Sequence, residues 1–222
     1  MSENLIPRHG GYRNLKSFRI AQLIYDITVQ FCDKYIDKRS RTHDQMVQAA
    51  RSGVQNIAEG SMDSAISKKI EMKLTGVARG SLEELKLDYQ DFLRHRSLPQ
   101  WPPDHPALKR FRERRCATLQ QFFEWEKEEI KILSSNTDKN GKNWTEGQKR
   151  SSTESASPCW SVPANSIAAV IEANGALSLL NLCIYFLSRQ LEAQAKAFEQ
   201  EGGFTERLYR HRIKKRGENE SN

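Results

Sequence analysis

The sequence predicts an all-α protein, an up-down four-helix bundle with one inserted extra helix and a helical C-terminal tail. Three observations support this fold class. Hydrophobic residues recur at three- and four-residue spacing through four long segments, which is the period of one helix face. No segment of useful length alternates polar and apolar residues as a strand does. A proline-rich stretch at residues 97–106 ends the third segment, because proline cannot continue a helix.

The first predicted helix spans residues 14–36. Its core stripe includes Ile24 and Phe31, yet three more apolar residues fall outside that stripe, namely Ile20, Leu23 and Tyr25. A helix that is apolar on more than one face is either deeply buried or shared between a core and a subunit interface. We therefore expect the protein to form a homo-oligomer in which this first helix contributes to the subunit interface.

The second predicted helix begins near Gln45 and ends at Gly60, as a C-terminal glycine should. Its small residues, such as Gly53, allow a neighbouring helix to approach closely. Asn56 and Glu59 are the polar residues near its buried face. We interpret them as structural, because buried polar groups are normally satisfied by local hydrogen bonds. The alternative is a catalytic role for Glu59, which would need a partner acid, a histidine or a metal ligand.

The third helix is predicted at residues 64–94, with Gly76 and Gly80 four positions apart, which favours close helix packing. Within the proline-rich stretch that follows, Trp101 is interpreted as a hydrophobic lid over the end of the bundle. A P-x-x-P ligand for an SH3-type domain is the alternative. A further helix is predicted at 106–133, basic in its first part and acidic in its second. Residues 134–161 have a linker composition.

The fourth bundle helix is predicted at 163–200, with Asn174 and Asn181 nearly on one face, where polar residues commonly fix register or an interface. The chain thus divides into four parts. Residues 14–96 hold the first three bundle helices, 97–161 the insertion, 162–201 the fourth helix and 202–222 a basic tail. Phe204, Leu208 and Ile213 give the tail helical spacing.

Two spaced blocks, RSGVQNIAEGS and ARGSLEEL, resemble the four-helix bundle proteins encoded in intervening sequences of bacterial 23S ribosomal RNA genes. Gly53 and Val54 replace the usual Ile-Pro of that family. The long tail is similar to the suffix on one branch of it. A related family member is the accessory protein of diversity-generating retroelements, so the resemblance implies a homopentamer that binds nucleic acid and assists a reverse transcriptase. The matching motif residues are Arg51, Asn56, Glu59, Gly60, Gly80, Ser81 and Glu84.

Composition limits the classes of function. The net charge is +7, a moderate basic bias that is compatible with an anionic partner. Cysteines and histidines are scattered, so we expect no metal site and no cofactor. No P-loop, G-x-S-x-G or H-E-x-x-H motif is present, so we expect no enzyme activity. The first residues lack an apolar core and the longest apolar stretch contains Asn181, so a soluble cytoplasmic protein without membrane contact is expected.

We therefore expect a non-catalytic, oligomeric accessory protein that binds nucleic acid, RNA in particular, through its phosphates. The alternative is a protein-interaction scaffold for an enzyme such as a reverse transcriptase, without direct nucleic-acid binding. A charged helix face that is merely solvated is the simplest competing explanation of the basic clusters. The candidate phosphate-binding residues form two clusters, Lys109, Arg110, Arg112, Arg114 and Arg115 in the insertion and Arg207, Arg210, Arg212, Lys214, Lys215 and Arg216 in the tail.

Overall fold

The computed structural model describes residues 11–140, 167–201, 208–209 and 212–213, and its described regular structure is helical throughout. This confirms the all-α prediction. A short 3-10 turn, η1 (Tyr12–Asn14), precedes six α-helices. In chain order these are α1 (Lys16–Tyr35), α2 (Arg41–Asp63), α3 (Lys68–His95), α4 (Pro106–Arg114), α5 (Leu119–Asn140) and α6 (Ile167–Glu201).

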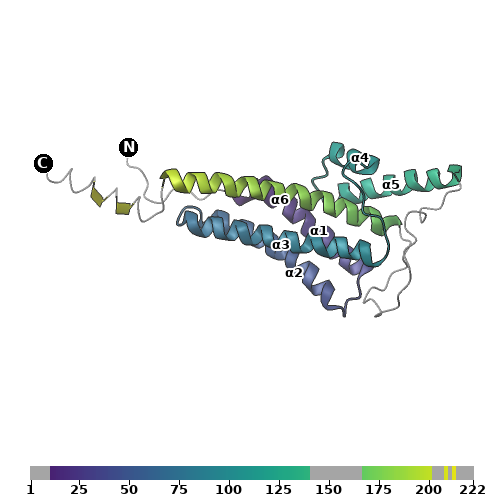
Figure 1. Ribbon diagram of the computed structural model, residues 1–222, viewed down its shortest axis with the longest axis horizontal. Coiled ribbons are helices and arrows are strands. Elements are labelled where there is room, and N and C mark those ends of the chain that lie inside the picture. The colour runs from purple at the N-terminus through teal and green to yellow at the C-terminus, as the bar shows by residue number, and fades with distance from the viewer. Residues whose placement is uncertain (1–10, 141–166, 202–207, 210–211, 214–222) are drawn as a thin grey trace.

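Four helices, α1, α2, α3 and α6, enclose one hydrophobic core. α1 contacts α2 and α6, and α3 contacts the same two helices, so the four lie side by side (Figure 1). Phe31 of α1 lies against both Tyr89 and Phe92 of α3, with ring centroids 4.8 and 4.7 Å apart. The fully buried side chains include Ile24, Ile27, Met46, Ile57, Leu82 and Leu85. Most apolar residues at helical spacing therefore face inward, but Ile66, Ile70 and Val77, which share the period of the third predicted helix, are 57%, 44% and 44% exposed, so their assignment to the core is wrong.

The turn between α2 and α3 differs from the sequence prediction. α2 does not end at Gly60 but continues to Asp63. Gly60 is buried, and a Cβ atom at this position would lie 3.2 Å from the Leu74 Cβ and 3.3 Å from the Glu71 carbonyl oxygen. The glycine thus permits a close helix crossing rather than a C-cap. α3 begins at Lys68, because the Ser67 hydroxyl accepts a hydrogen bond from the Ile70 amide and caps the helix.

Close packing at small residues is confirmed for α2 and not for α3. A Cβ atom at Gly53 would lie 2.7 Å from Leu82, so only glycine fits there. Gly76 and Gly80, by contrast, have no neighbouring atom within 4 Å of a hypothetical Cβ. The prediction that these two glycines pack closely within the chain is therefore wrong, since both face outward.

The first helix leaves less apolar surface than the sequence predicted. Leu23 is buried, with 4% of its surface exposed, and Ile20 and Tyr25 are partly buried against the core. The expectation of a large uncovered face on α1 is wrong for Leu23, because other helices already cover it.

Within the part of the chain that the structure describes, one helix is long and apolar enough to cross a membrane by length and composition. It is the Ile167–Gln200 segment of α6, and 67% of its most apolar window is buried inside the protein. A core helix of a soluble protein passes the same test, and the extent of burial fits that explanation.

Candidate nucleic-acid interface

The insertion is a helical hairpin rather than the single helix predicted for 106–133. α4 ends at Arg114, and Arg115 adopts left-handed backbone angles, with φ 52° and ψ 51°. The Thr118 hydroxyl then accepts a hydrogen bond from the Gln121 amide and starts α5, while the Gln121 side chain accepts one from the Ala117 amide. α5 continues to Asn140, into the stretch predicted as linker; residues 141–166 lie outside the described chain.

Aromatic side chains dock this hairpin on α6. Phe111 of α4 and Trp125 of α5 have ring centroids 4.4 Å apart, and Phe122 packs beside both. Gly175 of α6 lies directly beneath, because a Cβ atom there would be 2.8 Å from Phe122 and from Trp125. Figure 1 shows α4 and α5 together on one side of α6. The hairpin is thus a rigid attachment to the helical core.

The reversal of the chain brings the basic α4 and the acidic α5 together. Arg110 donates two hydrogen bonds to Glu129, at 2.7 and 2.6 Å. Arg114 donates to Glu128 at 2.6 Å and to Glu124 at 3.2 Å. The Glu129 side chain is only 1% exposed, so Arg110 serves to neutralise a buried carboxylate. Two of the predicted phosphate-binding residues, Arg110 and Arg114, therefore form ion pairs within the hairpin, and their contact with phosphates stays a prediction.

Three of the predicted phosphate-binding cations of the insertion are exposed and form no ion pair within the described residues. They are Lys109, Arg112 and Arg115. In the tail, Arg212 is exposed and helical. The other tail candidates, Arg207, Arg210, Lys214, Lys215 and Arg216, lie outside the described residues. Lys109 and Arg112 lie on α4 and Arg115 is its C-cap residue; these three, called the three α4 cations below, are with Arg212 the part of the predicted interface whose placement is defined.

A buried acid pair joins the hairpin to α1 and α6, and the sequence analysis missed it. Glu172 of α6 has a fully buried side chain, and its Oε1 accepts hydrogen bonds from the Lys34 ammonium and the Tyr35 hydroxyl, both at 2.8 Å. Glu126 of α5, 7% exposed, lies beside it. Burial and the adjacent Glu172 carboxyl raise the pKa of Glu126 to about 8. The sequence signal was Glu172 inside the apolar run AAVIEANGALSLL.

In its protonated form Glu126 can donate to Glu172. Among the described side chains, no ordinary donor reaches Oε2 of Glu172, which is buried. A neutral Glu126 carboxyl supplies the missing proton, and two carboxylates in this space would repel each other. Lys34 also lies over the Phe123 ring of α5, 4.2 Å from its centroid. The cluster therefore fixes the hairpin on the core in one protonation state.

The residue predicted as a lid, Trp101, is buried with 6% of its surface exposed. Its backbone amide donates to the Asn174 side chain at 2.7 Å, and Asn174 donates to the carbonyl oxygens of Pro99 and Val170. Asn174 thus fixes the proline-rich stretch on α6. Asn181 is exposed, so the two asparagines do not share the role predicted for them.

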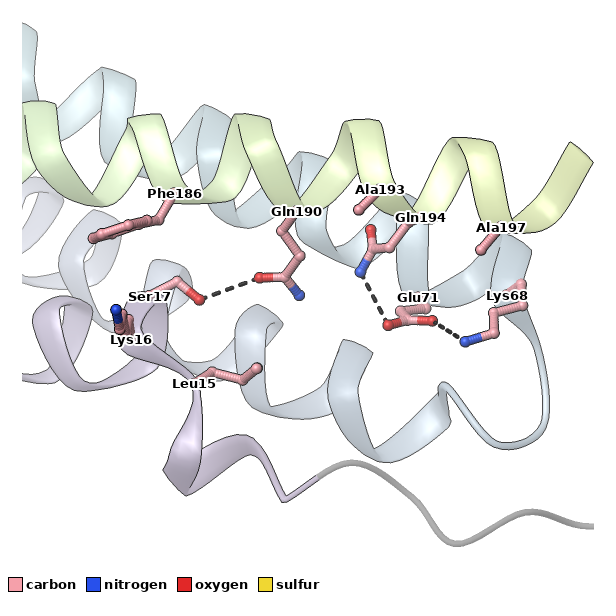
Figure 2. Close-up of a pocket in the computed structure, with 10 residues that line it drawn as sticks. All are labelled: Leu15, Lys16, Ser17, Lys68, Glu71, Phe186, Gln190, Ala193, Gln194 and Ala197. Atoms are coloured by element: carbon pink, nitrogen blue, oxygen red, sulfur yellow. Dashed lines mark hydrogen bonds and ion pairs between the residues drawn. The ribbon is translucent and has the colours of Figure 1, made fainter.

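A pocket of about 460 Å³ with a mixed polar and apolar lining lies where α1 and α3 begin and α6 approaches its end. Figure 2 shows that residues of all three helices line it. Gln194 donates to Glu71 at 3.0 Å, Lys68 pairs with Glu71 at 3.3 Å, and Ser17 donates to Gln190 at 3.2 Å. These contacts satisfy most of the pocket's polar groups internally. Lys16 and Lys68 are the basic residues in its lining.

The motif residues that carry the family resemblance lie on α2 and α3. Asn56 donates to the Ser52 carbonyl oxygen at 2.9 Å, and the Ser52 and Ser81 hydroxyls are 3.0 Å apart. Glu59 is exposed, so the prediction that it borders the buried face is wrong. The helix continues past Gly60 and keeps Glu59 on its outer side. Arg51, Gly80 and Glu84 are exposed as well.

No family model, no curated protein and no solved structure matches the chain. The resemblance to the intervening-sequence proteins therefore stays a prediction from the two sequence blocks.

Proposed function

We propose that this protein is a non-catalytic accessory protein that binds nucleic acid, RNA in particular, through the phosphate backbone and acts as an oligomer in the cytoplasm. The observation that carries the proposal is the three α4 cations. They are exposed on α4 and at its C-cap, and the other face of α4 is held by Arg110, Arg114 and the contact of Phe111 with Trp125. The backbone that carries them is already ordered, so binding phosphates costs mainly the freedom of the side chains themselves.

We further infer that the four long helices form an up-down four-helix bundle. Support comes from the order of their contacts, in which α1, α2, α3 and α6 each touch their two neighbours in a closed circuit. Only a few residues connect α1 to α2 and α2 to α3, which favours antiparallel neighbours. The α4–α5 hairpin lies between α3 and α6 in the sequence, yet α3 and α6 still contact each other directly.

Self-association supports binding, because it repeats each modest basic cluster. Exposed cations on several copies engage more phosphates than one chain can. The apolar face of α1 no longer supports the oligomer, since Leu23 is covered. Exposed apolar residues on α3 provide the support instead, including Ile70, Val77 and Leu87. A ring of five, which the resemblance implies, stays a prediction.

The test is a salt titration of binding to a generic RNA duplex. If about six phosphates are neutralised, log affinity should fall with a slope of about −5 against log salt. The variant Lys109→Gln, Arg112→Gln, Arg115→Gln should bind more weakly with a shallower slope. A matched control removes the same charge elsewhere, as Arg51→Gln, Lys69→Gln, Arg79→Gln, at exposed positions on α2 and α3.

Equal loss of binding in both triple variants would mean that net charge alone attracts RNA, and that α4 is not the interface. No binding at low salt would remove the proposal. The alternative function, a scaffold for a partner enzyme, would then be favoured, because α6 exposes Leu182 and Tyr185, which are 43% and 58% exposed. A large, rigid, exposed aromatic such as Tyr185 is typical of a protein-binding surface.

A further inference from the structure

The outer face of α3 carries a regular row of six residues, here called the α3 stripe. Its members are spaced alternately by three and four positions: Ile70, Lys73, Val77, Gly80, Glu84 and Leu87. Every one of them is exposed, and the three apolar members are 44%, 44% and 59% exposed. This alternation over about 26 Å of helix is the pattern of a seam between two helices. Within the described chain no helix covers it.

The α3 stripe is complementary to itself when a second copy runs in the opposite direction. Pairing by position then sets Ile70 against Leu87 and Val77 against Gly80. The same register sets Lys73 against Glu84. A two-fold axis repeats each pair, because an isologous interface uses the same surface twice. We propose that the α3 stripe binds the α3 stripe of a second copy of this chain, antiparallel, about a two-fold axis.

The two charges of the α3 stripe favour this direction. Lys73 lies near the start of the stripe and Glu84 near its end, so each faces the other when a second copy runs antiparallel. A parallel pair would set Lys73 against Lys73 and Glu84 against Glu84.

The C-terminal half of the stripe borders several acidic groups. Burial, together with Asp91 and Glu84, raises the pKa of Asp88 to about 6. Beside it, a groove of about 740 Å³ between α2 and α3 is lined by Glu84, Asp88 and Asp44, together with Arg41. A further cationic side chain would relieve the repulsion between Glu84 and Asp88, and the antiparallel register places Lys73 of a second copy opposite Glu84.

The glycines of α3 fit the same explanation. Glycine in a helix interior costs about 1 kcal/mol relative to alanine. Within the chain, no close packing offsets this cost at Gly76 or Gly80, since no atom lies within 4 Å of a hypothetical Cβ at either position. Opposite a second copy, Gly80 leaves a hollow for Val77 and lets the two helix backbones approach closely. The glycines and the exposed apolar residues of α3 are thus both explained by contact with a second copy.

This inference rests on the proposed self-association but not on nucleic-acid binding, and it closes at two copies. The experiment measures molar mass by light scattering after size-exclusion chromatography, with nucleic acid removed. The wild-type chain should elute with twice its mass of 25.6 kDa at tens of micromolar, a range set by the size of such an interface. Lys73→Glu and Glu84→Lys should each raise the dimer dissociation constant by about tenfold or more, because like charges would then face each other.

The decisive variant carries both changes. Lys73→Glu with Glu84→Lys should restore the dimer, since the opposite charges again face each other across the two-fold axis. Positions 73 and 84 are about 16 Å apart along one helix, so the rescue cannot occur within a chain. Gly80→Leu should give a folded monomer, because the added side chain meets open space in one chain and the Val77 of a second copy in the dimer.

A wild-type monomer at these concentrations would overturn the inference. So would a pentamer or dimer whose mass is insensitive to the charge reversals and to Gly80→Leu, since another surface would then hold the copies together. The RNA titration of monomeric Gly80→Leu keeps the two proposals apart. Binding by that monomer with lower affinity than the dimer supports both, whereas loss of dimer without any RNA binding in the wild type leaves the α3 inference standing alone.

Discussion

The acid pair of Glu126 and Glu172 is the residue-scale feature with the clearest consequence. One oxygen of Glu172 accepts hydrogen bonds from the Lys34 ammonium and the Tyr35 hydroxyl. The Glu126 carboxyl, which comes from α5, lies beside Glu172. Burial and the adjacent Glu172 carboxyl outweigh the attraction of Lys34 and Lys127, so the pKa of Glu126 is raised to about 8. The attachment of the hairpin is therefore linked to pH.

We predict that stability falls as pH rises towards 8 and that Glu126→Gln removes this dependence. Between about pH 5 and 8 the folded chain holds a proton on Glu126 that the unfolded chain has already lost, because the folded pKa is about 8. Unfolding then releases a proton, so the free energy of unfolding should fall by about 1.4 kcal/mol per pH unit from this group alone. The stabilisation from this proton is fully present below the ordinary glutamate pKa of 4.5, and it is lost as pH rises to the folded pKa of about 8.

Urea titrations at several pH values measure this effect. The glutamine amide donates a hydrogen bond as the protonated acid does, so Glu126→Gln should be more stable than wild type at pH 8 and similar at pH 5. Glu113→Gln on α4 is the control, since Glu113 is exposed. Parallel pH dependences in wild type and Glu126→Gln would show that Glu126 is ionised in the folded protein.

Sequence reasoning found the wrong glutamate. Glu59 attracted attention because it lies beside Ile57 and Ala58, yet it is exposed. Glu172 and Glu126 are buried by the return of α5 onto α6, a long-range contact that local period cannot reveal. A glutamate within an apolar run is the signal that was available, and it indicates burial without naming the partner.

At the scale of elements, the attachment of α5 depends on a glycine in α6. A Cβ atom at Gly175 would lie 2.8 Å from two aromatic rings, whereas at Gly80 it would meet nothing within 4 Å. We predict that Gly175→Ala lowers the free energy of unfolding by about 1–3 kcal/mol, because the rings must move. Gly80→Ala should instead raise it by about 0.5–1 kcal/mol.

Thermal and urea unfolding of the two variants make a matched pair, since the chemical change is identical. Gly80→Ala should be measured at a concentration below dimer formation, so that self-association does not contribute. Equal effects of the two substitutions would contradict the packing of Phe122 and Trp125 on Gly175.

The hairpin also depends on its internal ion pairs. We predict that Arg110→Gln destabilises the protein by about 1–2 kcal/mol, because it leaves the Glu129 carboxylate, 1% exposed, without its partner. The value is set below that of a fully buried pair because Arg110 is 41% exposed. Adding Glu129→Gln should recover most of the loss. A double variant as unstable as Arg110→Gln alone would mean that the arginine acts through packing.

The helix positions followed from sequence more closely than their ends. The predicted 14–36 helix corresponds to α1, Lys16–Tyr35, because apolar period and flanking polar residues are local signals. The break between α4 and α5 was missed because RERRCATL contains neither glycine nor proline. Arg115 adopts left-handed angles there, which costs a non-glycine residue about 1 kcal/mol and is offset by the contacts that the folded-back α5 makes.

At the scale of the whole molecule, the structure separates two surfaces that the sequence combined. The α3 stripe lies on the helical core, while the three α4 cations lie on the inserted hairpin, which contacts α6. Self-association and phosphate binding can therefore be changed independently. The sequence could predict the basic clusters but not which cations the hairpin neutralises, because that depends on the meeting of two helices.

The last prediction concerns the tail. Ending the chain after Glu201 removes all six tail candidates, from Arg207 to Arg216. If about three of them contact phosphates, the slope of log RNA affinity against log salt should become shallower by about 2.7 per chain. The dimer mass should not change, because the α3 stripe lies outside the removed segment. Titration of the truncated chain against wild type, with light scattering on both, tests this. A shallower slope with loss of the dimer would place the tail in the subunit interface, and an unchanged slope would assign phosphate binding to the three α4 cations alone.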